Sequence, residues 1–416
     1  MSNTVTPIPD LARRAKAATA ALAVASTETK NAALLAAADL LVAKAAAIEA
    51  ANAQDVAAAE ANGMEPGLVD RLRLDASRIA AMAGGLRQVA SLRDPVGQIT
   101  DGWVQPNGLR IEKMRVPLGV VAIIYEGRPN VTSDAFGLCL KSGNVAFLRG
   151  SSSAIHSNLA IAAVLRDALG QAGLPSDALV MVDDTRREAA KEFMQQRGYV
   201  DCLIPRGGQS LIKSILDNAT VPYVIDGAGN CHLYVDESAD FEMAINIAKN
   251  AKMQRIGVCN AVESLVVHDA VAEAILPLIG EALVGVELVG DERARSIVAM
   301  GEATEDDFAT EYLDMKMSVK VVPDLDEAIQ HVNETTTGHS AAIVTNEIVA
   351  ADRFVTEVDA AAVLVNASTR FVDGEEFGFG AEIGISTQKL HARGPMGLDQ
   401  LTTEKFVVRG NGQVRP

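Results

Sequence analysis

One cysteine, Cys259, lies in a stretch whose residue types favour nucleophilic chemistry. It falls between a predicted helix and a predicted strand at 264–267, in the sequence Gln254-Arg255-Ile256-Gly257-Val258-Cys259-Asn260-Ala261. Loops at strand ends present reactive groups. A thiolate at neutral pH needs positive surroundings, which we expect Lys252 and Arg255 to supply. The motif alone leaves open a buried, unreactive cysteine.

The other cysteines and the histidines show no pattern typical of a metal site. Cys139 falls in a predicted apolar helix and Cys202 in a predicted strand, whereas Cys231 is ambiguous. The 4 cysteines form no CxxC pair, and the 6 histidines form no HExxH motif. We therefore expect no bound transition metal.

Two loops that follow predicted strands have the residue types of an anion site. The chain contains neither GxGxxG nor a Walker A motif, so a nucleotide would need a different device. One loop has the sequence Pro205-Arg206-Gly207-Gly208-Gln209-Ser210, with a cation and two glycines. It opens a predicted helix, and backbone N–H groups at the start of a helix attract phosphate. The other carries Arg149 and the serines Ser151, Ser152 and Ser153. An ordinary turn or serine capping is the alternative for each loop.

The elements that must position these loops alternate between short apolar runs and longer helical stretches. Before Asp226, the runs expected to be strands lie at 116–125, 145–148, 178–182 and 200–204. After it, they lie at 233–235, 264–267, 317–322, 341–344 and 362–365. Such alternation is typical of βαβ units, so the sequence predicts two α/β domains with parallel sheets.

Two further regions differ from this alternation. Residues 10–62 are alanine-rich, with Leu34, Leu41 and Ile48 at seven-residue spacing, which predicts helices that end before Gly63. Residues 103–117 interleave apolar and polar side chains and predict a β-hairpin, and residues 406–408 a terminal strand.

Charge and hydropathy exclude several partners. The 416 residues carry 37 basic and 54 acidic side chains, a net charge of -17, so we expect neither nucleic acid nor an anionic membrane as partner. No run reaches the roughly 18 apolar residues of a membrane helix, and the alanine-rich run after Arg13-Arg14 favours a helix over a signal peptide. Scattered cysteines suit a reducing compartment, so we expect a cytoplasmic protein.

Taken together, these segments resemble the aldehyde dehydrogenase superfamily, and more narrowly those members that reduce γ-glutamyl phosphate. The loop at Cys259 is similar to the nucleophile loop of the superfamily, and residues 116–149 to its first two cofactor strands and the active-site loop between them. Matching segments keep the family order along nearly the whole chain, at 124–132, 139–144, 204–208, 254–260, 365–371 and 377–384.

The resemblance implies NADPH-dependent reduction of γ-glutamyl phosphate to glutamate 5-semialdehyde and phosphate, the second step of proline synthesis from glutamate. Cys259 would be the nucleophile that forms a thioester. The Cys259 backbone N–H and the Asn130 side chain would stabilise the oxyanion. A simple alignment with the superfamily places Arg128, and not Asn130, at the position of its oxyanion-binding asparagine. Arg370 would clamp the substrate carboxylate. The implied substrate-binding residues are Arg128, Arg255, Asn260 and Arg370.

The resemblance also implies the cofactor residues. NAD-preferring relatives often place an acid after the second cofactor strand, whereas residues 149–153 contain none. A 2′-phosphate would therefore be attracted to Arg149 and Ser151, which favours NADP(H) over NAD. The cofactor phosphates would lie near Arg206, Gly207, Gly208 and Ser210, and Glu311 would bind the nicotinamide ribose.

Hydrolytic members carry a glutamate that activates water, and here the nearest acid is Asp226, which is one methylene shorter and offset. That departure fits an enzyme that releases phosphate, because water attack would discard the activated acyl group. The alternatives are a hydrolytic or CoA-acylating semialdehyde dehydrogenase, or a non-enzymatic nucleotide-binding module.

The implied architecture is α/β and aldehyde dehydrogenase-like, with two Rossmann-like domains and a small β element. Residues 1–102 and 118–228 would bind the cofactor, and residues 229–399 would carry the nucleophile. Residues 103–117 and 400–416 would form an oligomerisation element, so a homo-oligomer is expected. The resemblance also implies a functional link to glutamate 5-kinase, which makes the labile substrate.

Overall fold

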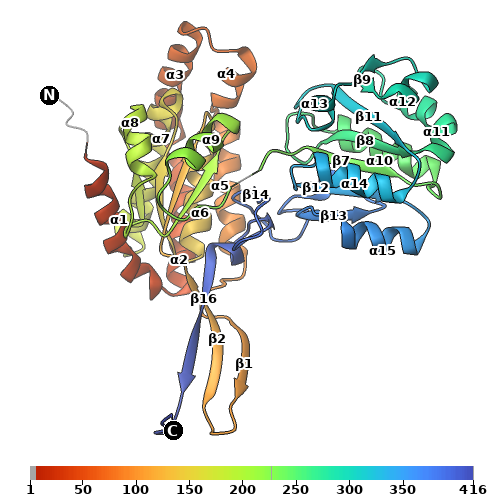
Figure 1. The fold of residues 1–416 in the computed structure, drawn as a ribbon. Coiled ribbons are helices and arrows are strands. Elements are labelled where there is room, and N and C mark those ends of the chain that lie inside the picture. Colours follow the sequence, from red (N-terminus) through yellow and green to blue (C-terminus); the bar gives the residue numbers. More distant parts are fainter. Residues whose placement is uncertain (1–5, 226, 416) are drawn as a thin grey trace. The chain divides into compact units, whose positions relative to one another are not determined.

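The computed structural model describes residues 6–225 and 227–415, which form two compact units (Figure 1). The boundary between the units lies at residue 225, close to the expected division at 228. Residues 379–384 and 396–416 belong to the first unit. The first unit thus includes residues 379–384 and 396–399, which the sequence-based boundaries placed in the second domain.

The N-terminal region of the first unit is helical, as its alanine-rich periodicity predicts. Ser26 and Asp75 cap two of these helices by accepting backbone N–H bonds, and the side chains of Leu34, Leu41 and Ile48 are fully buried. The helices are α1 (Ile8–Ala23), α2 (Thr27–Ala43), α3 (Ala45–Ala61), α4 (Pro66–Leu72) and α5 (Ala76–Ser91).

A four-stranded parallel sheet of order β5-β4-β3-β6 forms the core of the first unit. Its strands are β3 (Val120–Tyr125), β4 (Val145–Arg149), β5 (Leu179–Met181) and β6 (Cys202–Arg206). The helices are α6 (Val131–Lys141), α7 (Ile155–Gln171), α8 (Arg187–Phe193) and α9 (Gln209–Asn218), with 3-10 turns η1 (Ser152–Ala154) and η2 (Ser176–Ala178). The strand order reverses at β3, and open α/β sheets bind ligands at the carboxyl ends of strands beside such a reversal.

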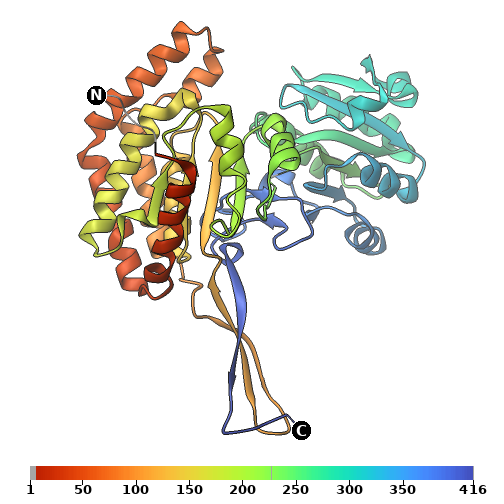
Figure 2. The same ribbon diagram turned by 60° about the vertical axis from the view of Figure 1, so that its left-hand side comes forward.

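A three-stranded antiparallel sheet extends from the first unit (Figures 1 and 2). It consists of β1 (Ile99–Val104), β2 (Arg110–Pro117) and β16 (Thr402–Arg409), in the order β1-β2-β16. The predicted hairpin is confirmed, although it begins earlier than residue 103, and its second strand has the C-terminal strand as its other neighbour. We call this sheet the β arm. It leaves Trp103 and Phe406 exposed, with their rings edge to face.

A seven-stranded parallel sheet of order β10-β9-β11-β8-β7-β12-β13 organises the second unit. Its strands are β7 (Cys231–Val235), β8 (Val262–His268), β9 (Glu287–Gly290), β10 (Gly301–Glu302), β11 (Lys316–Val322), β12 (Ser340–Val344) and β13 (Ala362–Val365). Side chains alternate between two core clusters, because Leu233 and Val235 face one side of the sheet and Tyr234 the other.

The helices of the second unit are α10 (Phe241–Met253), α11 (Asp269–Ala282), α12 (Glu292–Ile297), α13 (Glu305–Phe308), α14 (Leu325–Thr335) and α15 (Ile348–Glu357). Further short elements are η3 (Thr369–Phe371), β14 (Ile385–Ser386) and β15 (Gly394–Pro395), with η4 (Asp399–Leu401) in the first unit. The strands β9 and β10 were missed by the sequence reading.

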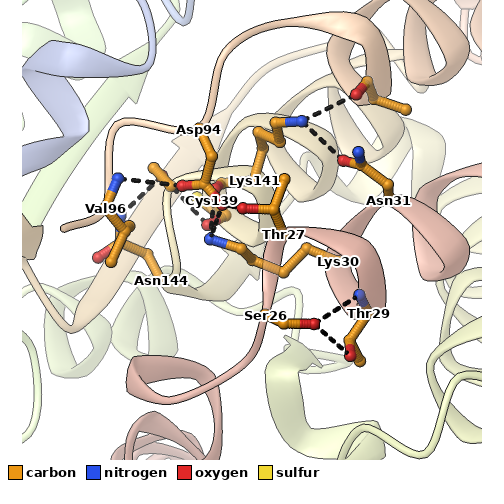
Figure 3. A network of polar contacts seen from close by, with 12 residues as sticks. Ser26, Thr27, Thr29, Lys30, Asn31, Asp94, Val96, Cys139, Lys141 and Asn144 are labelled. Atoms are coloured by element: carbon orange, nitrogen blue, oxygen red, sulfur yellow. Dashed lines mark hydrogen bonds and ion pairs between the residues drawn. The ribbon is translucent and has the colours of Figure 1, made fainter. Parts of the chain in front are cut away.

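Two buried lysines join α2, α6 and the segment that leads into the β arm (Figure 3). The Lys30 Nζ lies 2.5 Å from an Asp94 carboxylate oxygen and donates to the Lys141 carbonyl. Lys141 donates to the Asn31 side-chain oxygen and the Ala90 carbonyl, and burial lowers its pKa. Losing the Asp94 carboxylate would leave the buried Lys30 ammonium without its ion-pair partner, so this contact ties α2 to the segment before the arm.

The described residues offer few features typical of a membrane span or a metal site. In the part of the chain that the structure describes, no single helix is long and apolar enough to cross a membrane, and only α2 and α3 together, bent by 69°, have the length and composition for it. Within residues 6–225 and 227–415, no group of three or more His, Cys, Asp or Glu side chains is arranged to hold a metal ion.

Candidate active site

Cys259 lies in a loop that joins the end of α10 to the start of β8. Asp240 fixes the start of α10 by accepting the Met243 N–H, and β8 is buried in the centre of the sheet. Cys259 is partly exposed, whereas Cys139, Cys202 and Cys231 are buried. Burial raises the pKa of the Cys202 thiol to about 12 and also raises that of Cys139 and Cys231. The location of Cys259 thus suits a reactive thiol best.

Iodoacetamide is expected to modify Cys259 before the other cysteines, because alkylation needs an accessible thiol that can ionise. Mass spectrometry of peptides from briefly treated native protein measures the label at each site. Equal labelling of Cys231 at the same reaction time would contradict this assignment, and denatured protein, in which all four thiols react, is the control.

The backbone of Gly229 lies directly against the nucleophile loop. A Cβ atom at this position would come within 1.7 Å of the Cys259 carbonyl oxygen, so no larger residue fits without moving the backbone. The Gly229 N–H donates to the Glu311 Oε1 at 2.7 Å. The Cys231 thiol donates to the Cys259 carbonyl at 3.1 Å. The loop before β7, Glu311 and the nucleophile loop therefore form one packed group.

Arg370 and Arg255 share an electrostatic environment with Cys259. Burial is the main cause that lowers the pKa of Arg370, and nearby Arg255 lowers it further, whereas Asp373 and then Cys259 act to raise it. The Arg370 Nε donates to the Gln254 side chain at 2.8 Å, which ties η3 to the nucleophile loop. Two cations near a cysteine favour binding of an anionic substrate and formation of the thiolate.

Asn260 joins the same two segments from within the protein. It is 4% exposed, its Nδ2 donates to the Val372 carbonyl at 2.9 Å, and its carbonyl accepts the Thr369 hydroxyl at 2.7 Å. Its Oδ1 is buried without a partner among the described residues. These contacts assign Asn260 to holding the loops together, and direct substrate contact stays a prediction.

Lys252 does not supply the charge that the sequence suggested. It is fully buried and its Nζ lies 2.5 Å from the equally buried Glu263 carboxylate. Burial raises the pKa of Glu263 to about 7, against the opposing effect of Lys252. Because a carboxylate pairs with this ammonium, Lys252 adds no free charge to the nucleophile loop, and Arg255 and Arg370 are the cations proposed for this role. The expectation for Lys252 was wrong because its partner was not recognised in the sequence.

The loops that follow β3 and β6 meet at the start of α9 in the first unit. The Gly208 N–H, at the start of α9, donates to the Glu126 Oε2 at 3.0 Å. A Cβ atom on Gly207 would come within 2.6 Å of the same oxygen. A carboxylate therefore already accepts from the helix N-terminus, next to Arg206 and the exposed Ser210. This donor set fits the phosphates of a nucleotide cofactor. Sequence reasoning missed Glu126 because nothing in its local pattern marks it.

The polar side chains of the loop after β4 already form hydrogen bonds within the protein, which the sequence did not indicate. The Arg149 Nη2 donates to the Thr185 and Arg186 carbonyls, and burial lowers the pKa of Arg149. Ser151 caps η1 by accepting the Ser153 N–H. Arg186 holds the pKa of Asp184 below its usual range, so this corner also contains an acid, from the segment after β5. A cofactor contact by Arg149 or Ser151 stays a prediction.

Asn130 and Arg128 lie in the loop that opens α6, and both are exposed. The Asn130 Nδ2 donates to the Asp134 carboxylate at 2.9 Å. Burial raises the pKa of Asp134 to about 6. This pairing leaves one amide hydrogen of Asn130 for a substrate oxygen. Asp226, the nearest acid to the position of the hydrolytic glutamate, lies outside the described residues.

The structure therefore gathers the proposed residues in two groups. Within the second unit it brings together Cys259, Arg255, Asn260, Arg370 and Glu311. Within the first unit, the carboxyl ends of β3, β4 and β6 carry Arg128, Asn130, Arg149, Ser151, Arg206, Gly207, Gly208 and Ser210.

Comparison with known proteins gives matches along almost the whole chain. The model of the aldehyde dehydrogenase family matches residues 3–315 and 317–407. The γ-glutamyl phosphate reductase of Caldanaerobacter subterraneus subsp. tengcongensis is 55% identical over 407 residues, which cover 97% of this chain and 98% of that relative. The corresponding protein of Thermobifida fusca is 53% identical over 97% of this chain and 98% of its own length.

Solved structures agree with the sequence matches. The crystal structure of γ-glutamyl phosphate reductase from Thermotoga maritima has a TM-score of 0.97 and 48% identity, and the match covers 99% of this chain and 100% of that one. An acetylating aldehyde dehydrogenase from Geobacillus thermoglucosidasius has a TM-score of 0.70 at 17% identity, with 98% of this chain and 97% of that one covered, and shows the same fold.

Proposed function

Because this chain belongs to the aldehyde dehydrogenase family and, within it, to the γ-glutamyl phosphate reductases, we propose that it reduces γ-glutamyl phosphate to glutamate 5-semialdehyde with release of phosphate. This reaction is the second step of proline biosynthesis from glutamate. The observation that carries the proposal is a partly exposed cysteine that interacts with Arg370 and shares its loop with Arg255, in a chain similar to these reductases along almost its full length.

Cys259 performs the acyl transfer in this proposal. Its thiolate sulfur attacks the acyl carbon, a C–S bond forms, and the bond from that carbon to the phosphate oxygen breaks. Phosphate is released and an acyl thioester remains on Cys259. Arg255 and Arg370 offset the negative charge of the substrate, and Arg370 suits its carboxylate because a guanidinium binds a carboxylate through two hydrogen bonds. Arg128 is proposed as a further substrate contact.

Asn130 and the Cys259 backbone N–H are the proposed donors to the oxyanion that forms when the acyl carbon becomes tetrahedral. A donor aimed at this oxygen stabilises the transition state more than the ground state. Asp134 supports this role, because it accepts one amide hydrogen of Asn130 and thereby fixes which way the amide points.

Members of this family use a nicotinamide cofactor, and we propose NADP(H) here. The cofactor, when bound, supplies a hydride to the thioester carbon, and the resulting thiohemiacetal releases aldehyde and free thiol. Arg206, Gly207, Gly208 and Ser210 would hold its phosphates at the start of α9. Arg149 and Ser151 are proposed for the 2′-phosphate, and Glu311 for a ribose hydroxyl.

The reverse reaction tests the proposal. Glutamate 5-semialdehyde and NADP are expected to give NADPH, followed by its absorbance, only when inorganic phosphate is present. Phosphate-independent formation would overturn the proposal in favour of a hydrolytic dehydrogenase, and a requirement for CoA would indicate a CoA-acylating one. Replacing NADP by NAD is expected to lower kcat/KM about tenfold or more, by loss of a charge-assisted contact.

The β arm is the proposed contact with a second copy of this chain. Its outer strands β1 and β16 are sheet edges, and it leaves Trp103, Val104, Phe406 and Val408 exposed. Exposed apolar residues beside free edges favour pairing with another chain.

A kinase that makes the labile acyl phosphate, glutamate 5-kinase, is the proposed functional partner, and the proposed location is the cytoplasm.

A further inference from the structure

The Lys252–Glu263 ion pair lies at the base of the nucleophile loop. Lys252 lies in the last turn of α10 and Glu263 is the second residue of β8, so the pair joins the two ends of the segment that carries Cys259. Both side chains are fully buried, and the Nζ lies 2.5 Å from the Glu263 Oε2. The reaction proposed above uses neither side chain.

The second oxygen of Glu263 reaches a different loop. Its Oε1 accepts the backbone N–H of Leu313 at 3.2 Å. Leu313 has φ 52°, a left-handed conformation that is unfavourable for a leucine and needs support from surrounding contacts. On the same loop, the Tyr312 hydroxyl donates to the Asp307 carbonyl at 3.0 Å. Glu263 therefore supports a strained turn from inside the unit.

That turn carries Glu311 to the nucleophile loop. Glu311 accepts the Gly229 N–H at 2.7 Å, and Gly229 packs against the Cys259 backbone so closely that a Cβ atom would overlap it. A continuous set of contacts thus connects Glu263, Leu313, Glu311 and Gly229 to Cys259.

We propose that Glu263 is a positioning residue with Lys252 as its counter-ion. Through the turn at Leu313, it fixes the position of Glu311 relative to the loop that carries Cys259. This inference rests on the proposed function. An apolar pair of similar volume can replace a buried ion pair with little loss of stability. It cannot replace the oxygen that accepts the Leu313 N–H. The acceptor at position 263, rather than the charge, is therefore the part that positions the loop.

Two matched double variants separate these roles. K252Q/E263Q removes both charges and keeps an amide oxygen for Leu313, whereas K252M/E263L removes the charges and the acceptor. We expect both to keep a Tm close to that of the unchanged protein. K252M/E263L is expected to lose about 10- to 100-fold in kcat, the size of effect expected from a misplacement of about 1 Å, and K252Q/E263Q to stay within about threefold.

The rate of Cys259 alkylation by iodoacetamide, measured without substrate or cofactor, gives a readout that does not depend on the proposed reaction. This rate is expected to change at least about threefold in K252M/E263L, because that variant lacks the oxygen that accepts the Leu313 N–H. It is expected to stay unchanged in K252Q/E263Q, which keeps an oxygen at position 263. Equal kcat and equal alkylation rates in the two variants would overturn the proposal.

If K252M/E263L does not fold, hydrogen exchange in the unchanged protein decides. A Leu313 amide that exchanges as fast as an exposed loop amide would overturn the proposal, and a strongly protected one supports it. If the alkylation rates differ as expected but no phosphate-dependent turnover is found, the proposed function fails and the positioning role stands.

Discussion

Replacing Cys259 with alanine is expected to lower kcat by at least about 10⁴-fold, because no other group in the proposed mechanism forms the acyl-enzyme bond. Cys259 is the one partly exposed cysteine of the four. Neighbouring Cys231 cannot replace it, since burial holds the pKa of that thiol far above neutral. The measurement is phosphate-dependent NADPH formation from glutamate 5-semialdehyde and NADP at saturating concentrations.

The variant must still bind the cofactor for this result to be informative. Quenching of protein fluorescence by NADPH should give a Kd within about threefold of the unchanged protein, because removal of one side-chain atom at Cys259 leaves the proposed phosphate contacts in place. Cys202→Ala is the matched control, since Cys202 is buried at the start of β6 and should leave kcat nearly unchanged. Turnover by Cys259→Ala at the unchanged rate would refute the thioester mechanism.

Replacing Gly229 with alanine is expected to have the next largest effect, a loss of about 100-fold in kcat. The added methyl group would lie 1.7 Å from the Cys259 carbonyl oxygen. This neighbour is backbone, so the nucleophile loop or the loop before β7 must shift. A shift of about 1 Å at a reacting group costs about this much. The kcat of the reverse reaction and the Cys259 alkylation rate measure the effect.

Gly280→Ala is the control for the added methyl group. Gly280 lies in α11 of the same unit, and the nearest atom to a new Cβ there is 3.7 Å away. Alanine favours the helix by up to about 1 kcal/mol relative to glycine, so Tm should hold or rise and kcat should not change. A Gly229→Ala variant with unchanged kcat and unchanged alkylation would mean that the close approach has no catalytic consequence.

Local patterns determined the elements of this protein. The strands of the two central sheets are short apolar runs because parallel strands are buried on both faces, and runs such as Val120–Tyr125 and Ser340–Val344 show this in the sequence itself. The missed strands β9 and β10 are short and largely exposed at their starts, so they carry no continuous apolar run. They join the sheet through contacts between distant segments, because β9 pairs with β11 and β10 pairs with β9.

Residue types around Cys259 also indicated the chemistry, because a cysteine, two arginines and glycine-rich turns keep their chemical character in any fold. Which charges remain available depended on contacts between distant segments. The Lys252 ammonium is neutralised by Glu263, the Arg149 guanidinium donates to carbonyls of the segment after β5, and the Glu126 carboxylate accepts from Gly208.

Hydrogen bonds and ion pairs act over only a few ångströms, so they form between residues that the fold brings together, whatever their separation in the chain. The sequence alone therefore determined the family and the fold class, and it predicted the nucleophile. Only the tertiary structure decided that Arg370 interacts with Cys259, which lysine is neutralised, and that Glu263 accepts a hydrogen bond from the loop that carries Glu311.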